Sequence, residues 1–142
     1  MTMTLPILAH ESVTAYFDVK LGISFVTYKG ILDSEVTKIL YGWVQELLPL
    51  IGENATRGVI FDFRQVTRFT RDNLHASRQE SSKINRQKDM STHPVALIVE
   101  TTYQEQMVTA SMQLTPIEER KQVFYSMEDA LDYIEYWHEE NE

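Results

Sequence analysis

The sequence predicts an α/β protein with a mixed β-sheet, in the order β-β-α-β-α-β-α-β-α. Three observations predict this fold class: two adjacent strand-like segments near the N-terminus, short apolar runs that alternate with helical patterns, and a length of 142 residues. That length suits one domain, since domains most often contain roughly 100–150 residues. We therefore expect a single domain over residues 1–142, with its core at about 13–137.

The first two strands are expected to form an antiparallel hairpin. Residues 13–19 alternate apolar and polar side chains, a period of two that is typical of a half-buried strand. Residues 20–22 suit a turn, and residues 23–29, rich in β-branched and aromatic side chains, suit the return strand. We expect residues 1–10 to be a loose lead-in and Gly30 to close the hairpin.

The first helix has the most regular pattern in the chain. Apolar residues recur at steps of three and four over residues 36–48, after N-cap candidates at Asp33 and Ser34. Pro49, Gly52 and Asn54 are expected to end this helix. Its apolar face should pack on the sheet through Trp43 and Leu47.

The remaining elements alternate between strand and helix, which predicts parallel pairing from the second strand onward. Continuous apolar runs at 59–63 and 95–99 indicate buried strands, and a short last strand is expected at 122–125. Helices are expected over residues 70–88 and 103–114 and again after Ser126, a candidate cap. The 70–88 helix is mostly polar; its large aliphatic residues are Leu74 and Ile84.

Residues 62–72 are expected to form a loop between the third strand and the second helix. Ligands of open α/β sheets bind outside the carboxyl ends of strands, and helix N-termini favour anions. A structural explanation fits the same residues: Val66 and Phe69 would fill the core while Thr70 caps the helix. The sequence leaves both interpretations open.

Composition excludes several classes of protein. Cysteine is absent, so disulfides and zinc–thiolate sites are excluded. The net charge of −8 argues against general binding to nucleic acid or to anionic membranes. No apolar run approaches the roughly 20 residues that span a bilayer, and the N-terminus does not have the pattern of a secretory signal. We expect a cytoplasmic protein without a metal or cofactor.

The charge is unevenly distributed along the chain. Residues 57–88 contain eight basic and three acidic side chains, a net charge of +5, so the remainder carries −13. A basic segment in an acidic protein suits an acidic protein partner or an anionic ligand. Ion pairs within the fold or in a homodimer would also account for it.

Several segments resemble STAS domains, the anti-anti-sigma-factor fold, and more closely their SpoIIAA-like, or STAS/SEC14-like, group of small bacterial proteins. The resemblance runs from about Val13 to Trp137. It rests on the apolar strand at 59–63, on Val66, Thr67 and Phe69 after it, and on the aromatic strand and Glu-Asp-Ala-Leu helix at 124–137.

The resemblance implies a non-enzymatic regulatory or protein-interaction module. In STAS regulators a serine at the start of the second helix is phosphorylated by the anti-sigma kinase. Here that segment falls at residues 70–73, where Arg71 holds the phosphoacceptor position and Thr70 precedes it. The expected working surface is the segment 67–88, with candidate partner- or anion-binding residues Arg68, Thr70, Arg71, Arg78 and Arg86.

Two other functions remain open. SEC14-like relatives bind apolar ligands, so the alternative is a small-molecule or lipid carrier whose cavity would be lined by Trp43, Met107, Met112 and the tyrosines. An enzyme would use Asp62, Asp72 and His75, although their spacing does not favour one. Tyr136 falls off the apolar stripe of the last helix, and we expect a homodimer through exposed aromatic or complementary charged surface.

Overall fold

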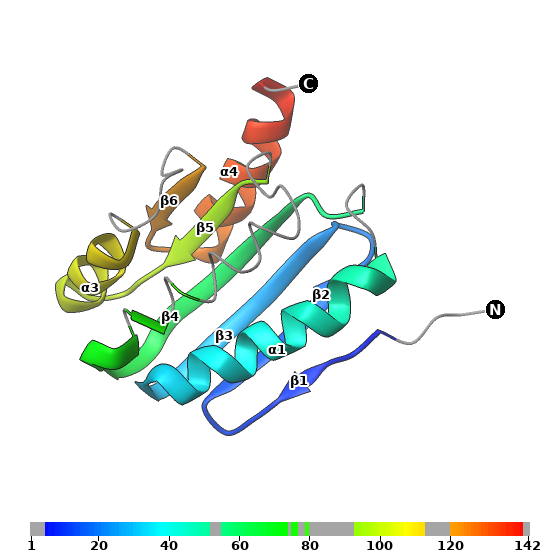
Figure 1. The fold of residues 1–142 in the computed structure, drawn as a ribbon. Helices are drawn as coiled ribbons and strands as arrows, with labels where there is room; N and C mark the ends of the chain where they lie inside the picture. Colours follow the sequence, from blue (N-terminus) through cyan, green and yellow to red (C-terminus); the bar gives the residue numbers. More distant parts are fainter. Residues whose placement is uncertain are drawn as a thin grey trace.

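In the computed structural model, the residues described are 5–51, 55–73, 75, 76, 79, 93–112 and 120–140. They form a mixed sheet of six strands in chain order (Figure 1). Strands β1 to β3 are antiparallel neighbours, and β3 to β6 are parallel, which confirms the predicted fold class. The strands are β1 (Leu8–Ala9), β2 (Val13–Asp18), β3 (Ile23–Leu32), β4 (Gly58–Phe69), β5 (Val95–Ile98) and β6 (Lys121–Phe124).

Helices cover the two faces of the sheet unequally. Helix α1 (Ser34–Ile51) lies in front of β2 and β3 in Figure 1, and helix α4 (Met127–Glu140) lies behind β5. Helix α3 (Thr102–Met112) contributes Val108 to the same core as α1. Crossovers between parallel strands are right-handed, so a sheet whose strands are added in one direction receives its connecting helices on one face. The α1 face is therefore the face of the connecting helices.

The core on the α1 face is the larger of the two. Trp43 and Leu47 are buried in it, as the helical spacing predicts. The Trp43 indole Nε1 donates a hydrogen bond of 2.9 Å to the carbonyl oxygen of Pro6, which fixes the N-terminal segment beside α1. Asp33 caps the helix, because its Oδ1 accepts from the backbone N–H of Val36 at 3.0 Å.

The core on the opposite face is built by α4. Ala130 and Ile134 pack on Ile60, Ala96 and Ile98, and all five are buried. Close approach depends on Gly58, where a Cβ atom would lie 3.1 Å from a side-chain carbon of Ile134. The predicted cap is confirmed: the Oγ of Ser126 accepts from the Asp129 N–H at 3.1 Å.

The N-terminal hairpin is longer than the sequence indicates. Residues 8–9 form β1 on the edge of β2, where a loose lead-in was expected. Gly30 does not close the hairpin: β3 continues to Leu32. Gly30 has a φ of 79° at a shift in the β3–β4 register, a conformation that glycine adopts without steric cost.

Two predicted boundaries differ from the structure. Pro49 does not end α1, because the helix runs on to Ile51, directly before Gly52. The predicted loop at 62–72 is mostly strand, since β4 continues to Phe69 beside the extended β3. The carboxyl end of β4 is therefore Phe69. Residues 71–73, 75, 76 and 79 are helical, while Leu74, Arg78, Ile84, Arg86 and Leu114 lie outside the described residues.

Candidate functional site

The carboxyl ends of β3 and β4 bring two helix starts together. Leu32 pairs with Phe69 at the end of the two strands. Helix α1 begins after Leu32, and the helical residues from Arg71 begin after Phe69. The backbone N–H of Thr70 donates to the carbonyl oxygen of Leu32 at 3.1 Å, and its hydroxyl donates to the same oxygen at 3.4 Å. The two helix N-termini are thus fixed to one another.

A polar network joins these helix starts. The Ser34 hydroxyl donates to Asp72 Oδ2 at 2.8 Å, and the Thr70 hydroxyl also bonds Asp72. Between the two helix starts, the hydroxyl of Thr37 donates a hydrogen bond to the side-chain oxygen of the buried Asn73. Hydrogen bonds from Thr70, and then from Ser34, lower the pKa of Asp72 below its usual value. An ionised carboxylate is therefore held at an exposed position between two helix starts.

The predicted binding residues differ in their surroundings. Arg68 and Arg71 are exposed, whereas Thr70 is half-buried and engaged with Leu32 and Asp72. Ile31, the register partner of Arg68, is 50% exposed and adds apolar area to this surface. The predicted binding residues Arg78 and Arg86 lie outside the described residues. We refer to Ile31, Ser34, Arg68, Arg71 and Asp72 as the strand-end surface.

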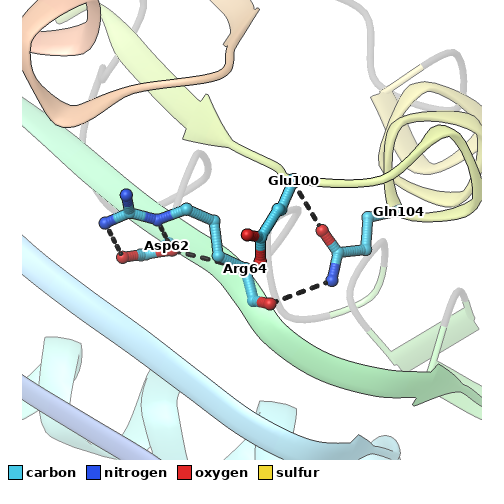
Figure 2. Close-up of polar contacts among 4 residues, drawn as sticks. All are labelled: Asp62, Arg64, Glu100 and Gln104. Atoms are coloured by element: carbon cyan, nitrogen blue, oxygen red, sulfur yellow. Dashed lines mark hydrogen bonds and ion pairs between the residues drawn. The ribbon is translucent and has the colours of Figure 1, made fainter.

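A second polar cluster fixes α3 against β4 (Figure 2). The Arg64 guanidinium binds the nearly buried Asp62 through two hydrogen bonds, of 3.0 and 2.8 Å. This hydrogen bonding raises the pKa of Arg64, with smaller electrostatic contributions from Asp62 and Glu100. The buried Gln104 amide donates to the carbonyl oxygens of Arg64 and Val66. These contacts are structural, because the charged and amide groups bond one another and the backbone.

The three residues considered for an enzyme do not converge in one hydrogen-bonded arrangement. Asp62 is engaged by Arg64, Asp72 by Thr70 and Ser34, and His75 is exposed. Within the described residues, no group of three or more His, Asp or Glu side chains could hold a metal ion. No described helix combines the length and apolar character needed to span a membrane.

Two residues expected to line a carrier cavity are packed into the core. Trp43 is buried with its indole N–H bonded to Pro6, and Met107 packs against the same core. The side chain of Met112 lies outside the described part of the structure. The carrier function therefore stays a prediction.

Sequence reasoning missed three residues that shape these clusters. Ser34 appears only as a cap candidate in the sequence, yet it bonds Asp72 across 38 positions. Ile31 follows the expected end of the hairpin, and Gln104 is one polar residue among several in a helical segment. A weak signal exists for Gln104, because a glutamine three residues after Thr101 suits a capping box. The Gln104 N–H does donate to Thr101 Oγ1.

Several solved structures are similar to this chain, among them proteins with a SpoIIAA-like fold and anti-sigma factor antagonists. An uncharacterized protein of the DUF3478 family with a SpoIIAA-like fold, from Shewanella loihica, is 18% identical with a TM-score of 0.58, over 94% of this chain and 98% of that one. An anti-sigma factor antagonist from Mycobacterium paratuberculosis is 15% identical with a TM-score of 0.56, over 89% and 97% of the two chains.

A third structure, the anti-sigma factor antagonist SpoIIAA in its unphosphorylated form, is 11% identical with a TM-score of 0.56, over 87% and 98% of the two chains. Neither the family models nor the curated proteins compared with the sequence gave a match. The similarity therefore confirms the resemblance at the level of the fold: the chain has a SpoIIAA-like fold.

Proposed function

We propose that this protein is a non-enzymatic, STAS-like regulatory module that binds an acidic protein partner through the strand-end surface. The observation that carries the proposal is the pairing of two helix starts beside the exposed Arg68 and Arg71. Two of the similar structures are anti-sigma factor antagonists, which supports a regulatory function. The proposed location is the cytoplasm.

The chemistry of the surface suits recognition of a protein. Ile31 supplies exposed apolar area, and the two guanidinium groups can each form paired hydrogen bonds with a carboxylate. Asp72 and Ser34 are already bonded to one another, so they hold the surface rigid. Charges at the rim of an interface mainly change the association rate and the salt dependence of binding.

The experiment compares two double charge reversals. Arg68→Glu with Arg71→Glu alters the strand-end surface, and Lys20→Glu with Arg57→Glu makes the same change in charge at exposed positions near the amino end of β4. Each variant and the unmodified protein would capture partners from the native host for identification by mass spectrometry. The affinity of the purified partner would then be measured by biolayer interferometry at two salt concentrations.

We expect the Arg68 and Arg71 reversal to weaken partner binding by at least tenfold, with the melting temperature nearly unchanged. The Lys20 and Arg57 control should bind within about twofold of the unmodified protein. Equal loss in both variants would mean that net charge alone drives the interaction. Normal binding by the Arg68 and Arg71 variant would exclude the strand-end surface as the binding site.

Self-association is a separate proposal. Tyr136 is 60% exposed on α4, off the buried stripe, as its position in the sequence predicts. A homodimer through this aromatic surface would remove Tyr136 from water. Light scattering over a range of concentrations tests it, and a constant mass of 16.6 kDa would exclude it.

A further inference from the structure

The sheet face that carries α4 is only partly covered by the described helices. On this face the strand register aligns one row of side chains across the sheet: Tyr16 pairs with Phe25, Phe25 with Ile60, and Ile60 with Ala96. Ile60 and Ala96 are buried beneath α4. Phe25 is half-buried and Tyr16 is 48% exposed. The apolar row therefore continues from under α4 onto an open part of the sheet.

Neighbouring residues extend this open area toward the sheet edge. The rings of Tyr16 and Phe25 stack with centroids 5.3 Å apart. Ile7, directly before β1, is 74% exposed at the edge of the sheet. Thr14 and Thr27, which are paired with each other, flank the row. We call Ile7, Thr14, Tyr16, Phe25 and Thr27 the open strip.

The open strip has the width of one helix. Strands lie about 4.8 Å apart, and packed helices lie about 8–10 Å apart. Helix α4 packs over β4 and β5 through Ile60, Ala96 and Ile98. A second helix beside α4, two strands further along, would lie over β2 and β3, where the stacked Tyr16 and Phe25 form the floor.

The solvent-facing edge of α4 next to the open strip is acidic. Tyr133 contacts Phe124 of β6, with ring centroids 5.2 Å apart, so the opposite side of the helix faces β3. Leu131 lies on that side, and Glu128 and Glu135, three residues before and four residues after it, lie at its outer edge. Leu131 packs on the same core as Phe25, and both glutamates are exposed. Asp62 is the register partner of Thr27 on β4. Its carboxylate is already paired with Arg64 (Figure 2).

We propose that the open strip is a docking site for a basic amphipathic helix of another protein, lying beside α4. Its apolar stripe would cover Tyr16, Phe25 and Leu131, and its Lys or Arg side chains would meet Glu128 and Glu135. Helix-in-groove recognition uses this combination of an apolar stripe and flanking charges. A second copy of this chain fits less well, because its own exposed helix α4 is acidic and the chain carries −8.

The test uses two synthetic 18-residue amphipathic peptides, one of Leu and Lys and one of Leu and Glu, with the same apolar stripe. Binding is measured by fluorescence anisotropy, and the contacted residues are mapped by NMR shift perturbation. We expect the Leu/Lys peptide to bind at least tenfold more tightly than the Leu/Glu peptide and to shift Tyr16, Phe25 and Leu131. No binding, or shifts that avoid the open strip, would overturn the proposal.

Matched variants separate docking from general attraction to an acidic protein. Tyr16→Gln should weaken Leu/Lys binding at least fivefold, while Leu50→Gln, at an exposed apolar position of α1, should not. Glu128→Lys with Glu135→Lys should weaken it at least tenfold. The control, Asp129→Lys with Glu140→Lys, makes the same change in charge at exposed positions in the first and last turns of α4. Equal weakening by both pairs would overturn the proposal.

The remaining outcome is self-association through the open strip. If the free protein is a dimer by light scattering and Tyr16→Gln makes it a monomer, the open strip is a self-interface and the proposal is wrong. Circular dichroism and the melting temperature of each variant establish that it is folded. Because the open strip and the strand-end surface are separate, failure here leaves the proposed function untouched.

Discussion

Gln104 joins helix α3 to strand β4 by donating its side-chain amide to the carbonyl oxygen of Val66, over 3.0 Å. The same amide nitrogen also donates to the Arg64 carbonyl oxygen at 3.2 Å. Its Oε1 accepts from the backbone N–H groups of Glu100 and Thr101. One buried side chain therefore satisfies backbone groups from both the extended end of β4 and the start of α3 (Figure 2).

Replacing Gln104 with leucine should destabilise the protein substantially. The side chain is similar in size, but backbone donors and acceptors on both elements lose their partner, and each buried group left unpaired costs about 1–3 kcal/mol. We expect a loss of at least about 2 kcal/mol in the free energy of unfolding, measured by urea denaturation. Gln106→Leu, at an exposed position of the same helix, should change it by less than about 0.5 kcal/mol. Equal effects would show that the amide contacts contribute little.

Truncating Trp43 should be among the most damaging changes on α1. Trp43→Ala removes a buried ring and leaves the Pro6 carbonyl without its donor, so we expect a loss of about 3–5 kcal/mol. Tyr136→Ala, at a residue that is 60% exposed, should have little effect. Thermal and urea unfolding of both variants measure the difference. A loss below about 1 kcal/mol for Trp43→Ala would contradict its place in the core.

Gly22 and Gly30 should respond differently to alanine. Both have positive φ angles, 70° and 79°, so alanine strains either position by about 1–2 kcal/mol. At Gly22 the new Cβ would also lie 2.7 Å from the carbonyl oxygen of Ala55, whereas nothing lies within 4 Å at Gly30. We expect Gly22→Ala to lower the denaturation midpoint more than Gly30→Ala. The reverse order would contradict this packing at the β2–β3 turn.

Asp72 should make stability depend on pH in the acid range. Its pKa is lower in the folded protein than in the unfolded chain, so its contribution is present above the unfolded pKa. The contribution is lost as the pH falls through the folded pKa. Carbon NMR titration should place the Asp72 midpoint below the ordinary 3.8. Ser34→Ala should raise it by removing one donor, and Ser126→Ala, a cap on α4, should leave it unchanged.

Local patterns predicted the elements whose own residues decide their structure. The alternation in β2, the apolar run of β5 and the spacing in α1 each identify an element without information about its neighbours. The end of β4 could not be found in this way. Residues 64–69 contain Arg, Gln and Thr, and they become strand because β3 continues alongside them, with Gly30 allowing the shift in register.

The two candidate surfaces depend even more on distant contacts. Arg68 and Arg71 were predicted from charge, but their apolar neighbour Ile31 follows only from the β3–β4 register. The Ser34–Asp72 hydrogen bond likewise joins residues that are far apart in the chain. The open strip needs both the register that stacks Tyr16 on Phe25 and the placement of α4, which no local pattern specifies.

The position of α4 in chain order has a consequence for synthesis of the protein. Every described strand emerges from the ribosome before residues 127–140, because chains are made from the N-terminus. The α1 face can be covered as soon as its connecting helices emerge, but Ile60, Ala96 and Ile98 remain in contact with water until α4 packs over them. A nascent chain therefore passes through a stage in which one apolar face of the sheet is exposed to water. A chaperone that binds apolar segments would bind the chain at this stage.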